Sequence, residues 1–311
     1  RSCALARSCA LARSCALALT CALALSCAPV PRPVSPAAPP LSAPAGGAAA
    51  ATPGPAAATF ELWAEPTVDV GLVWDADSAI VVTGVGAVVL APAGAPGDGR
   101  HLQSAGRVAI RPSADGATVT AGAASVKMSA TDTLWISPAS GDSARLEWAR
   151  HGWRGRFKVF VNPRRRLTLV DRLPLEIYLM GVVPGEIGAL DDRAIEAGKA
   201  QAIAARSYTL FYRGRRGAEG FDLFGTVEDQ LYSPIEAERP LATHYVEATR
   251  GRLAISEGFP IRANYCSTCG GITAAVWEAW PAAALPYLTS HTDRGSADWC
   301  TASPQYRWHE R

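Results

Sequence analysis

The amino-acid sequence is poor in charge, and most of its length is also poor in cysteine. Lys, Arg, Asp and Glu make up 19% of the 311 residues, hydrophobic residues make up 49%, and the formal net charge is +2. This composition excludes a wholly disordered chain. It also excludes a nucleic-acid-binding protein that depends on a strongly basic surface. The length allows one large domain or two modest ones, each with a buried core.

Cysteine is concentrated at the N-terminus. Five of the eight cysteines recur every six residues in the first 27: Cys3, Cys9, Cys15, Cys21 and Cys27. Only Cys266, Cys269 and Cys300 lie elsewhere, so the sequence has no disulfide framework spread along the chain. No acidic residue precedes Glu61, and the positive net charge therefore comes from the N-terminal arginines.

Residues 1–27 resemble an export signal, in which arginines precede an apolar Ala/Leu run. At about 13 residues, this run is too short to span a bilayer as a permanent anchor. The four residues ending at Cys27 are similar to a bacterial lipobox, with Cys27 as the acylated residue. The alternative is that the hexapeptide repeat, which has no initiator Met, is a mistranslated upstream segment. Residues 28–59 contain nine prolines and predict an extended, solvated linker.

Residues 60–164 have the pattern of a β-rich module. Short β-branched runs, several of them bounded by glycines, predict strands at 68–74, 80–83, 87–90, 108–110 and 118–120. Residues 156–161 and 167–170 predict a hairpin, and residues 252–265 predict a second one around a turn at 256–259.

A long helix is predicted from Asp191 or Asp192 as N-cap to about Tyr212, ahead of Gly214. Projected at about 100° per residue, it has small or apolar residues on both sides, which predicts burial nearly all round. The fold class is therefore α+β, with a β-rich module leading into a mixed domain over residues 165–311.

Two cations on this helix are candidate functional residues. Lys199 and Arg206 are seven residues apart and are predicted to point along one face into the protein. Because an unpaired buried cation costs several kcal/mol, both need carboxylate or carbonyl partners. Two interpretations stay open at this point: the cations form structural ion pairs, or they orient a catalytic carboxylate or contact substrate.

Glu186 is the candidate acid. It follows Pro184-Gly185, which marks a turn, and has apolar residues on both sides. A carboxyl group in such surroundings has a raised pKa, which suits a general acid. The alternative is that Glu186 only begins a helix.

Several ordered motifs surround these residues. Residues 173–186 form one, and residues 196–208 are close to the pattern EALKAQAVAARTY; shorter ones lie at 221–223, 230–232, 246–251 and 265–271. On these residues the chain resembles the sporulation stage II protein D family, also called SpoIID/LytB domains, over about residues 165–310. Because residues 308–311 show no closing signal, we expect the domain to continue beyond them.

The resemblance implies an exported lytic transglycosylase of the cell envelope that cuts peptidoglycan glycan strands, needs no cofactor and works beside a cell-wall amidase. Glu186 matches the family's catalytic acid. The residues that would support the site or line its cleft are Lys199, Gln201, Arg206, Tyr265, Ser267 and Gly270. Membrane contact is expected only through an N-terminal lipid anchor, and nucleic acid is not an expected partner. The alternative function is a non-catalytic wall-binding module that stimulates a partner amidase.

Metal binding and thiol chemistry remain open from the sequence. Many family members have a Cys/His pattern, FDLCDTTHCQVY, which is interpreted as a metal site. Here Phe224, Glu228 and Asp229 replace its Cys and His residues, so zinc is not expected there. Cys266 and Cys269 form a C-x-x-C motif that is consistent with zinc binding together with Cys300 and His291, with a disulfide to Cys300, with a redox pair or with free thiols.

Overall fold

The structure is a computed structural model that describes residues 64–93, 98–140, 144–188, 190–293, 295 and 299–306. The predicted export signal and Pro-rich linker lie outside the described residues, which all belong to one compact unit beginning at Pro55. Strands and helices give this unit an α+β fold, as predicted. In the described residues, no helix is both long and apolar enough to cross a membrane.

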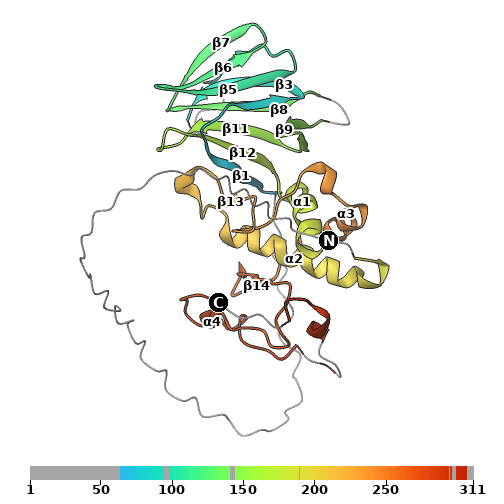
Figure 1. Ribbon diagram of the computed structural model, residues 1–311. Helices are drawn as coiled ribbons and strands as arrows, with labels where there is room; N and C mark the ends of the chain where they lie inside the picture. The colour runs from blue at the N-terminus through green and yellow to red at the C-terminus, as the bar shows by residue number, and fades with distance from the viewer. Residues whose placement is uncertain are drawn as a thin grey trace, which may run out of the picture. The chain divides into compact units, whose positions relative to one another are not determined.

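Two β-sheets form the first part of the unit (Figure 1). The seven-stranded sheet has the order β13 (Leu223–Phe224), β1 (Thr67–Ala76), β12 (Leu167–Pro174), β11 (Arg156–Val161), β8 (Asp132–Pro138), β3 (Val85–Pro92) and β4 (Arg100–Leu102). The six-stranded sheet has the order β10 (His151–Trp153), β9 (Leu146–Trp148), β2 (Ile80–Thr83), β5 (Arg107–Ser113), β6 (Gly116–Ala121) and β7 (Ala124–Ser129). Neighbouring strands are antiparallel except β1 and β13, which are parallel.

Alternating burial explains why these segments form strands. In β11, Phe157, Val159 and Val161 are buried while the residues between them are partly exposed. Most buried residues of both sheets belong to one hydrophobic cluster, which also contains residues of the first two helices, and Val170 and Phe224 belong to a second, smaller cluster. The predicted hairpin is confirmed as β11 and β12. The expected boundary between the β-rich module and the mixed domain, at residues 164 and 165, falls in the turn of this hairpin.

The other strand predictions are confirmed to different extents. β2 has the predicted bounds, and β1, β3, β5 and β6 extend beyond their predicted runs. β4 and β7 to β10 were not predicted. Three of these five have only three residues, and so short a strand is stabilised by pairing with its neighbours rather than by its own periodicity.

Helices and short hairpins follow the sheets. The elements are α1 (Leu175–Ile187), the 3-10 turn η2 (Asp192–Ala194), α2 (Ile195–Tyr212), η3 (Gly217–Glu219), η4 (Ile235–Ala237), α3 (Pro240–Ala248), β14 (Ile255–Ser256), β15 (Phe259–Pro260), α4 (Val276–Ala279) and η5 (Trp299–Ala302). The second predicted hairpin forms as β14 and β15, but its strands have only two residues each and include Ser256 and Phe259, which were expected in the turn. Its turn residues, Glu257 and Gly258, both have positive φ, as two-residue hairpin turns require.

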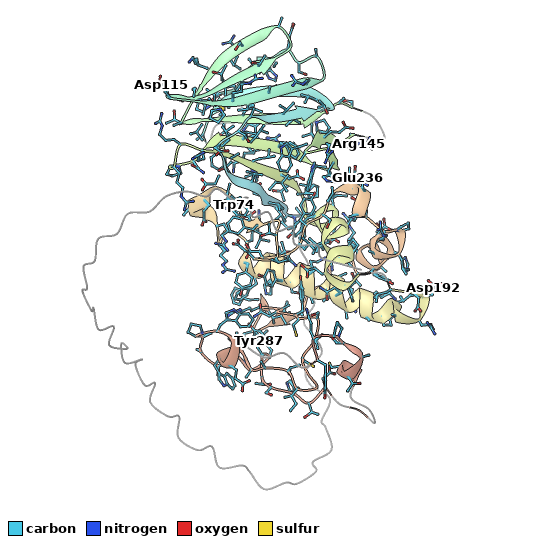
Figure 2. The ribbon with its side chains drawn as sticks, viewed as in Figure 1. Trp74, Asp115, Arg145, Asp192, Glu236 and Tyr287 are labelled. Atoms are coloured by element: carbon cyan, nitrogen blue, oxygen red, sulfur yellow. The ribbon has the colours of Figure 1, made fainter. Side chains whose placement is uncertain are left out.

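α2 confirms the predicted helix, which ends at Tyr212. Asp191 accepts a hydrogen bond from the backbone N–H of Arg193 and starts the turn at Asp192, which Figure 2 labels. Burial all round is correct only for the second half of α2, where residues 205–209 are buried. The first half exposes Glu196, Ala197 and Ala200, so it forms part of the protein surface.

A buried ion pair joins the helices. The Arg206 side chain is 0% exposed, and its guanidinium donates two hydrogen bonds to Glu176 of α1, at 2.9 and 2.6 Å. The same guanidinium binds the backbone oxygens of Val246 in α3 and Arg252 beyond it, at 3.3 and 3.1 Å. Glu176 also accepts a hydrogen bond from the backbone N–H of Gly251. Arg206 therefore forms the buried structural ion pair that the first of the two interpretations predicted.

Removing the cation is expected to destabilise the protein strongly. In Arg206→Met, Glu176 stays buried without its positive partner, and we expect the free energy of unfolding to fall by about 3–5 kcal/mol. In the double variant Glu176→Leu/Arg206→Met no charge is left buried, and we expect a smaller loss than in the single variant. Urea unfolding of the full chain measures both values.

Lys199→Met is the matched control, because Lys199 lies on the same helix but binds the exposed Glu196 at 2.7 Å. Such a surface pair contributes less than about 1 kcal/mol. Equal losses in Lys199→Met and Arg206→Met would contradict the structural role of Arg206.

Candidate active site

Glu186 lies in the last turn of α1, not at a turn or at a helix start as the sequence suggested. Pro184 is inside the helix, where it lacks the N–H that would bond one turn back. The preceding residues 175–183 are almost all buried, and this packing carries the helix through Pro184. α1 then ends at Gly188, whose N–H binds the Pro184 oxygen at 3.2 Å.

A second segment reaches Glu186 because α1 has no side chain at Gly181. A Cβ there would lie 2.6 Å from the Tyr232 ring and 2.7 Å from the Ser233 oxygen. The Ser233 N–H binds the Gly181 oxygen at 3.1 Å, so residues 231–233 lie directly against the helix. This close approach brings the backbone of Leu231 to the carboxylate.

The Glu186 carboxylate has two polar partners. Its Oε1 accepts a hydrogen bond from the Leu231 N–H at 2.7 Å, and the Tyr265 hydroxyl also hydrogen-bonds to it. Burial is the largest influence and raises the pKa of Glu186, while the two hydrogen bonds stabilise the charged form and lower the pKa. The raised pKa predicted from the apolar neighbours is therefore confirmed, and no second carboxylate is among its causes.

Gln230 holds Tyr265 in place. Its buried amide Nε2 donates to the Tyr265 hydroxyl at 3.0 Å, and its Oε1 accepts from Tyr178 of α1 and Thr209 of α2 at 3.2 and 2.7 Å. In the sequence, Gln230 is only one residue of the motif at 230–232, and its role in holding Tyr265 was not predicted. Gln230 lies between Asp229 and Leu231, so its neighbours gave no signal, and its complete burial could not be known from the sequence.

The three helix residues expected to support the site have different environments. Lys199 pairs with Glu196 at the surface, which contradicts the prediction that it points into the protein. Arg206 binds Glu176, which precedes Glu186 by ten residues, about 15 Å along the helix axis. Gln201 has a buried Nε2 without a hydrogen-bond partner among the described residues.

Tyr265 and Ser267 line a pocket, and Gly270 is not among its lining residues. Ser267 donates to Gln305 at 3.2 Å, and Gly270 has a φ of 69° that favours glycine. Trp280 lines the same pocket and is 46% exposed. The pocket thus runs from the partner of Glu186 to an exposed indole ring.

The loop that matches the family's Cys/His pattern is held together by ion pairs. Asp229, in place of a cysteine, is buried and binds Arg215 at 3.1 Å and Arg216 at 3.4 Å. It also accepts a hydrogen bond from the Phe224 N–H at 2.9 Å. These three interactions of the Asp229 side chain stabilise the loop.

Two of the three C-terminal cysteines lie close together. Cys269 and Cys300 have their Sγ atoms 3.5 Å apart, whereas Cys266 is exposed. His291, expected as a fourth zinc ligand, has its Nε2 2.8 Å from the Thr289 hydroxyl and is outside the group formed by Cys269, Asp293 and Cys300.

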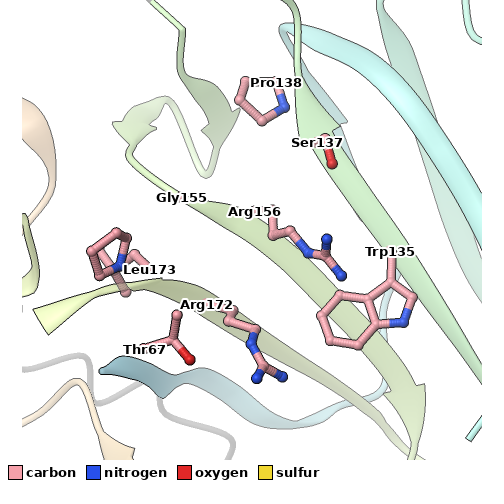
Figure 3. A pocket seen from close by; sticks show the side chains of 9 residues that line it. Thr67, Trp135, Ser137, Pro138, Gly155, Arg156, Arg172 and Leu173 are labelled. Atoms are coloured by element: carbon pink, nitrogen blue, oxygen red, sulfur yellow. The ribbon is translucent and has the colours of Figure 1, made fainter. Parts of the chain in front are cut away.

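A separate hollow lies on the seven-stranded sheet (Figure 3). Trp135 is 8% exposed because the guanidinium groups of Arg156 and Arg172 cover its ring at 4.2 and 5.7 Å. No carboxylate lines this hollow, so it offers no acid for bond cleavage.

Comparisons with known proteins agree with the resemblance. The family model described as "Stage II sporulation protein" matches residues 163–255, from the turn between β11 and β12 to β14. Stage II sporulation protein D of Bacillus subtilis is 32% identical over 153 residues, which cover 44% of this chain and 43% of that protein. An uncharacterised protein of Brachyspira hyodysenteriae is 30% identical over 131 residues, 42% of this chain and 35% of that protein.

The amidase enhancer of Bacillus subtilis is 33% identical over 130 residues, 42% of this chain and 16% of that protein. The chain spans less than half of the length of these relatives. No solved structure gives a significant match. The family model and the sporulation and amidase-enhancer relatives together show that this part of the chain is similar to the SpoIID/LytB family.

Proposed function

We propose that the protein is a peptidoglycan lytic transglycosylase in which Glu186 is the single acid and base. The observation that carries the proposal is the half-buried Glu186 carboxyl, with a raised pKa and two hydrogen-bond donors around it. A carboxyl group with a raised pKa keeps its proton to higher pH than an ordinary glutamate does, as a general acid requires.

The reaction requires Glu186 to donate one proton and then to accept one. Glu186 donates its proton to the glycosidic oxygen as the bond from that oxygen to the anomeric carbon breaks. The C6 hydroxyl of N-acetylmuramic acid then attacks the anomeric carbon and gives its proton to the Glu186 carboxylate. The product is a 1,6-anhydro-muramyl end, and the carboxyl group returns to its starting form.

A single carboxylate distinguishes this reaction from ordinary glycoside hydrolysis, which uses two. Asp229 is the acidic residue closest in sequence to Leu231, and it is committed to Arg215 and Arg216. The hydrogen bonds from Leu231 and Tyr265 stabilise the carboxylate that forms after proton donation, which lets the same residue act next as the base.

The pocket beyond Tyr265 fits a carbohydrate strand. Trp280 is half exposed in it, and an indole ring packs well against the apolar face of a pyranose. Ser267 and Asn264 add polar groups to the lining. We therefore infer that the glycan extends from Glu186 along this pocket.

A cell-envelope location follows from such a substrate, and we propose export and acylation at Cys27 on the N-terminal pattern alone. The second candidate function is a wall-binding module that stimulates an amidase. It is favoured by the relative named amidase enhancer.

Glu186→Gln tests the proposal. The amide has no acidic proton, so we expect cleavage of purified denuded glycan strands to fall by about 10²–10⁴-fold. Mass analysis of the products identifies anhydro-muramyl ends from the unaltered protein. Glu196→Gln is the control, because Glu196 is exposed on the next helix. This variant should cleave the glycan at the normal rate.

Other products would decide against the proposal. Reducing ends would mean hydrolysis. Binding of glycan without cleavage, together with stimulation of an added amidase, would favour the second function.

Tyr265→Phe is expected to change the pH dependence. The Tyr265 hydrogen bond lowers the pKa of Glu186, so its loss raises that pKa further. The acid is active when protonated, and activity falls as pH rises through this pKa. The alkaline limb of kcat/KM should therefore move to higher pH in Tyr265→Phe, but not in Tyr287→Phe, which alters another tyrosine of the same pocket. An unmoved limb in Tyr265→Phe would contradict the assigned hydrogen bond.

A further inference from the structure

Three potential metal ligands meet in the C-terminal loops. Cys269 Sγ lies 3.5 Å from Cys300 Sγ and 3.4 Å from Asp293 Oδ2. The three ligand atoms all lie within 4.8 Å of one another. They come from three segments, namely the loop that follows Tyr265, the segment before η5, and η5 itself.

Backbone hydrogen bonds hold these segments together. The Asp293 N–H binds the Gly271 oxygen at 3.0 Å, and the Thr273 N–H binds the His291 oxygen at 2.8 Å, on either side of a bridge between Ile272 and Thr292. On the other side of the cluster, the hydroxyls of Thr268 and Ser303 are 2.7 Å apart. Asp293 is thus positioned beside Cys269 by main-chain pairing.

The donor set and its spacing suit zinc. Bonds of about 2.3 Å to sulfur and about 2.0–2.2 Å to oxygen in a tetrahedral site place two sulfurs about 3.8 Å apart, and a sulfur and an oxygen about 3.5 Å apart. The two separations here are 3.5 and 3.4 Å. A disulfide would need about 2.05 Å between the sulfurs and gives Asp293 no role. Thiolate ligands do not suit calcium or magnesium.

We propose that Cys269, Asp293 and Cys300 bind a zinc ion, with the fourth position open to water from the adjoining pocket. All three residues line that pocket, together with Tyr265 and Tyr287, and Figure 2 labels Tyr287 in these loops. The backbone N–H groups of Cys269, Gly270 and Gly271 hydrogen-bond to the Cys300 sulfur. Such donors around a thiolate orient it as a ligand.

The zinc site would stabilise the loop that carries Tyr265. Cys269 follows Tyr265 by four residues, and few elements of regular structure lie among the described residues beyond β15. A metal that joins this loop to Asp293 and η5 replaces the packing that a larger core would supply. Zinc binding itself does not depend on the proposed transglycosylase activity.

Metal analysis of the full chain, purified with a reducing agent and equilibrated with zinc, tests the proposal. We expect one zinc per chain. Cys269→Ser, Cys300→Ser and Asp293→Asn should each lower the zinc affinity by at least about tenfold. Cys266→Ser is the control and should bind zinc normally, because Cys266 is exposed and outside the cluster. Cobalt substitution adds a second readout, since thiolate-to-cobalt absorption should be lost in Cys269→Ser.

Two other results would overturn the proposal. Without reductant, an intact mass lighter by two hydrogen atoms, with Cys269 and Cys300 both resistant to alkylation and no zinc bound, would mean a disulfide. No bound zinc with both thiols open to alkylation would mean ordinary cysteines. Asp293→Asn alters an exposed side chain, so it keeps the test decisive if a cysteine variant fails to fold. The zinc measurement does not depend on glycan cleavage. A protein that binds zinc but does not cleave glycan would contradict only the proposed function, so the two tests can be told apart.

Discussion

The helical part of the protein depends on the ion pair between Arg206 and Glu176. Both charges lie in the interior, where either one alone would cost several kcal/mol, so α1 and α2 must pack with these side chains in contact. The same guanidinium binds α3 and the backbone beyond it, so three segments meet at one point. This constraint orients α1, whose other end carries Glu186.

Glu186 is positioned by α1, but its proton affinity is set by other segments. Burial raises the pKa, and donors from Leu231 and Tyr265 oppose that rise. Gln230 holds the tyrosine and binds both helices, so the surroundings of the carboxyl group are tied to the same core as the ion pair. Opposed influences of this kind suit a group that gives up a proton and then takes one back.

Local sequence patterns predicted those elements whose stabilising features lie within a few neighbouring residues. The β11–β12 hairpin has its alternation and its turn within a few residues, and it forms as predicted. β9 and β10 have three residues each and exist because they pair, so no periodicity could reveal them. Pro184-Gly185 is a turn signal in isolation. In the folded protein, packing of the apolar residues before it keeps the segment helical.

The α+β class, the motifs that resemble SpoIID/LytB domains and the candidate acid could all be predicted from the sequence, because motif order and the apolar neighbours of Glu186 are properties of the chain alone. The groups that surround Glu186 could not be predicted, because they come together only when the chain folds. Lys199 and Arg206 lie on one helix, yet the first pairs with an exposed carboxylate and the second with a buried one. Gln230 likewise gained its partners Tyr178, Thr209 and Tyr265 only in the folded chain. Such pairings arise from long-range packing and desolvation, and no local pattern encodes either.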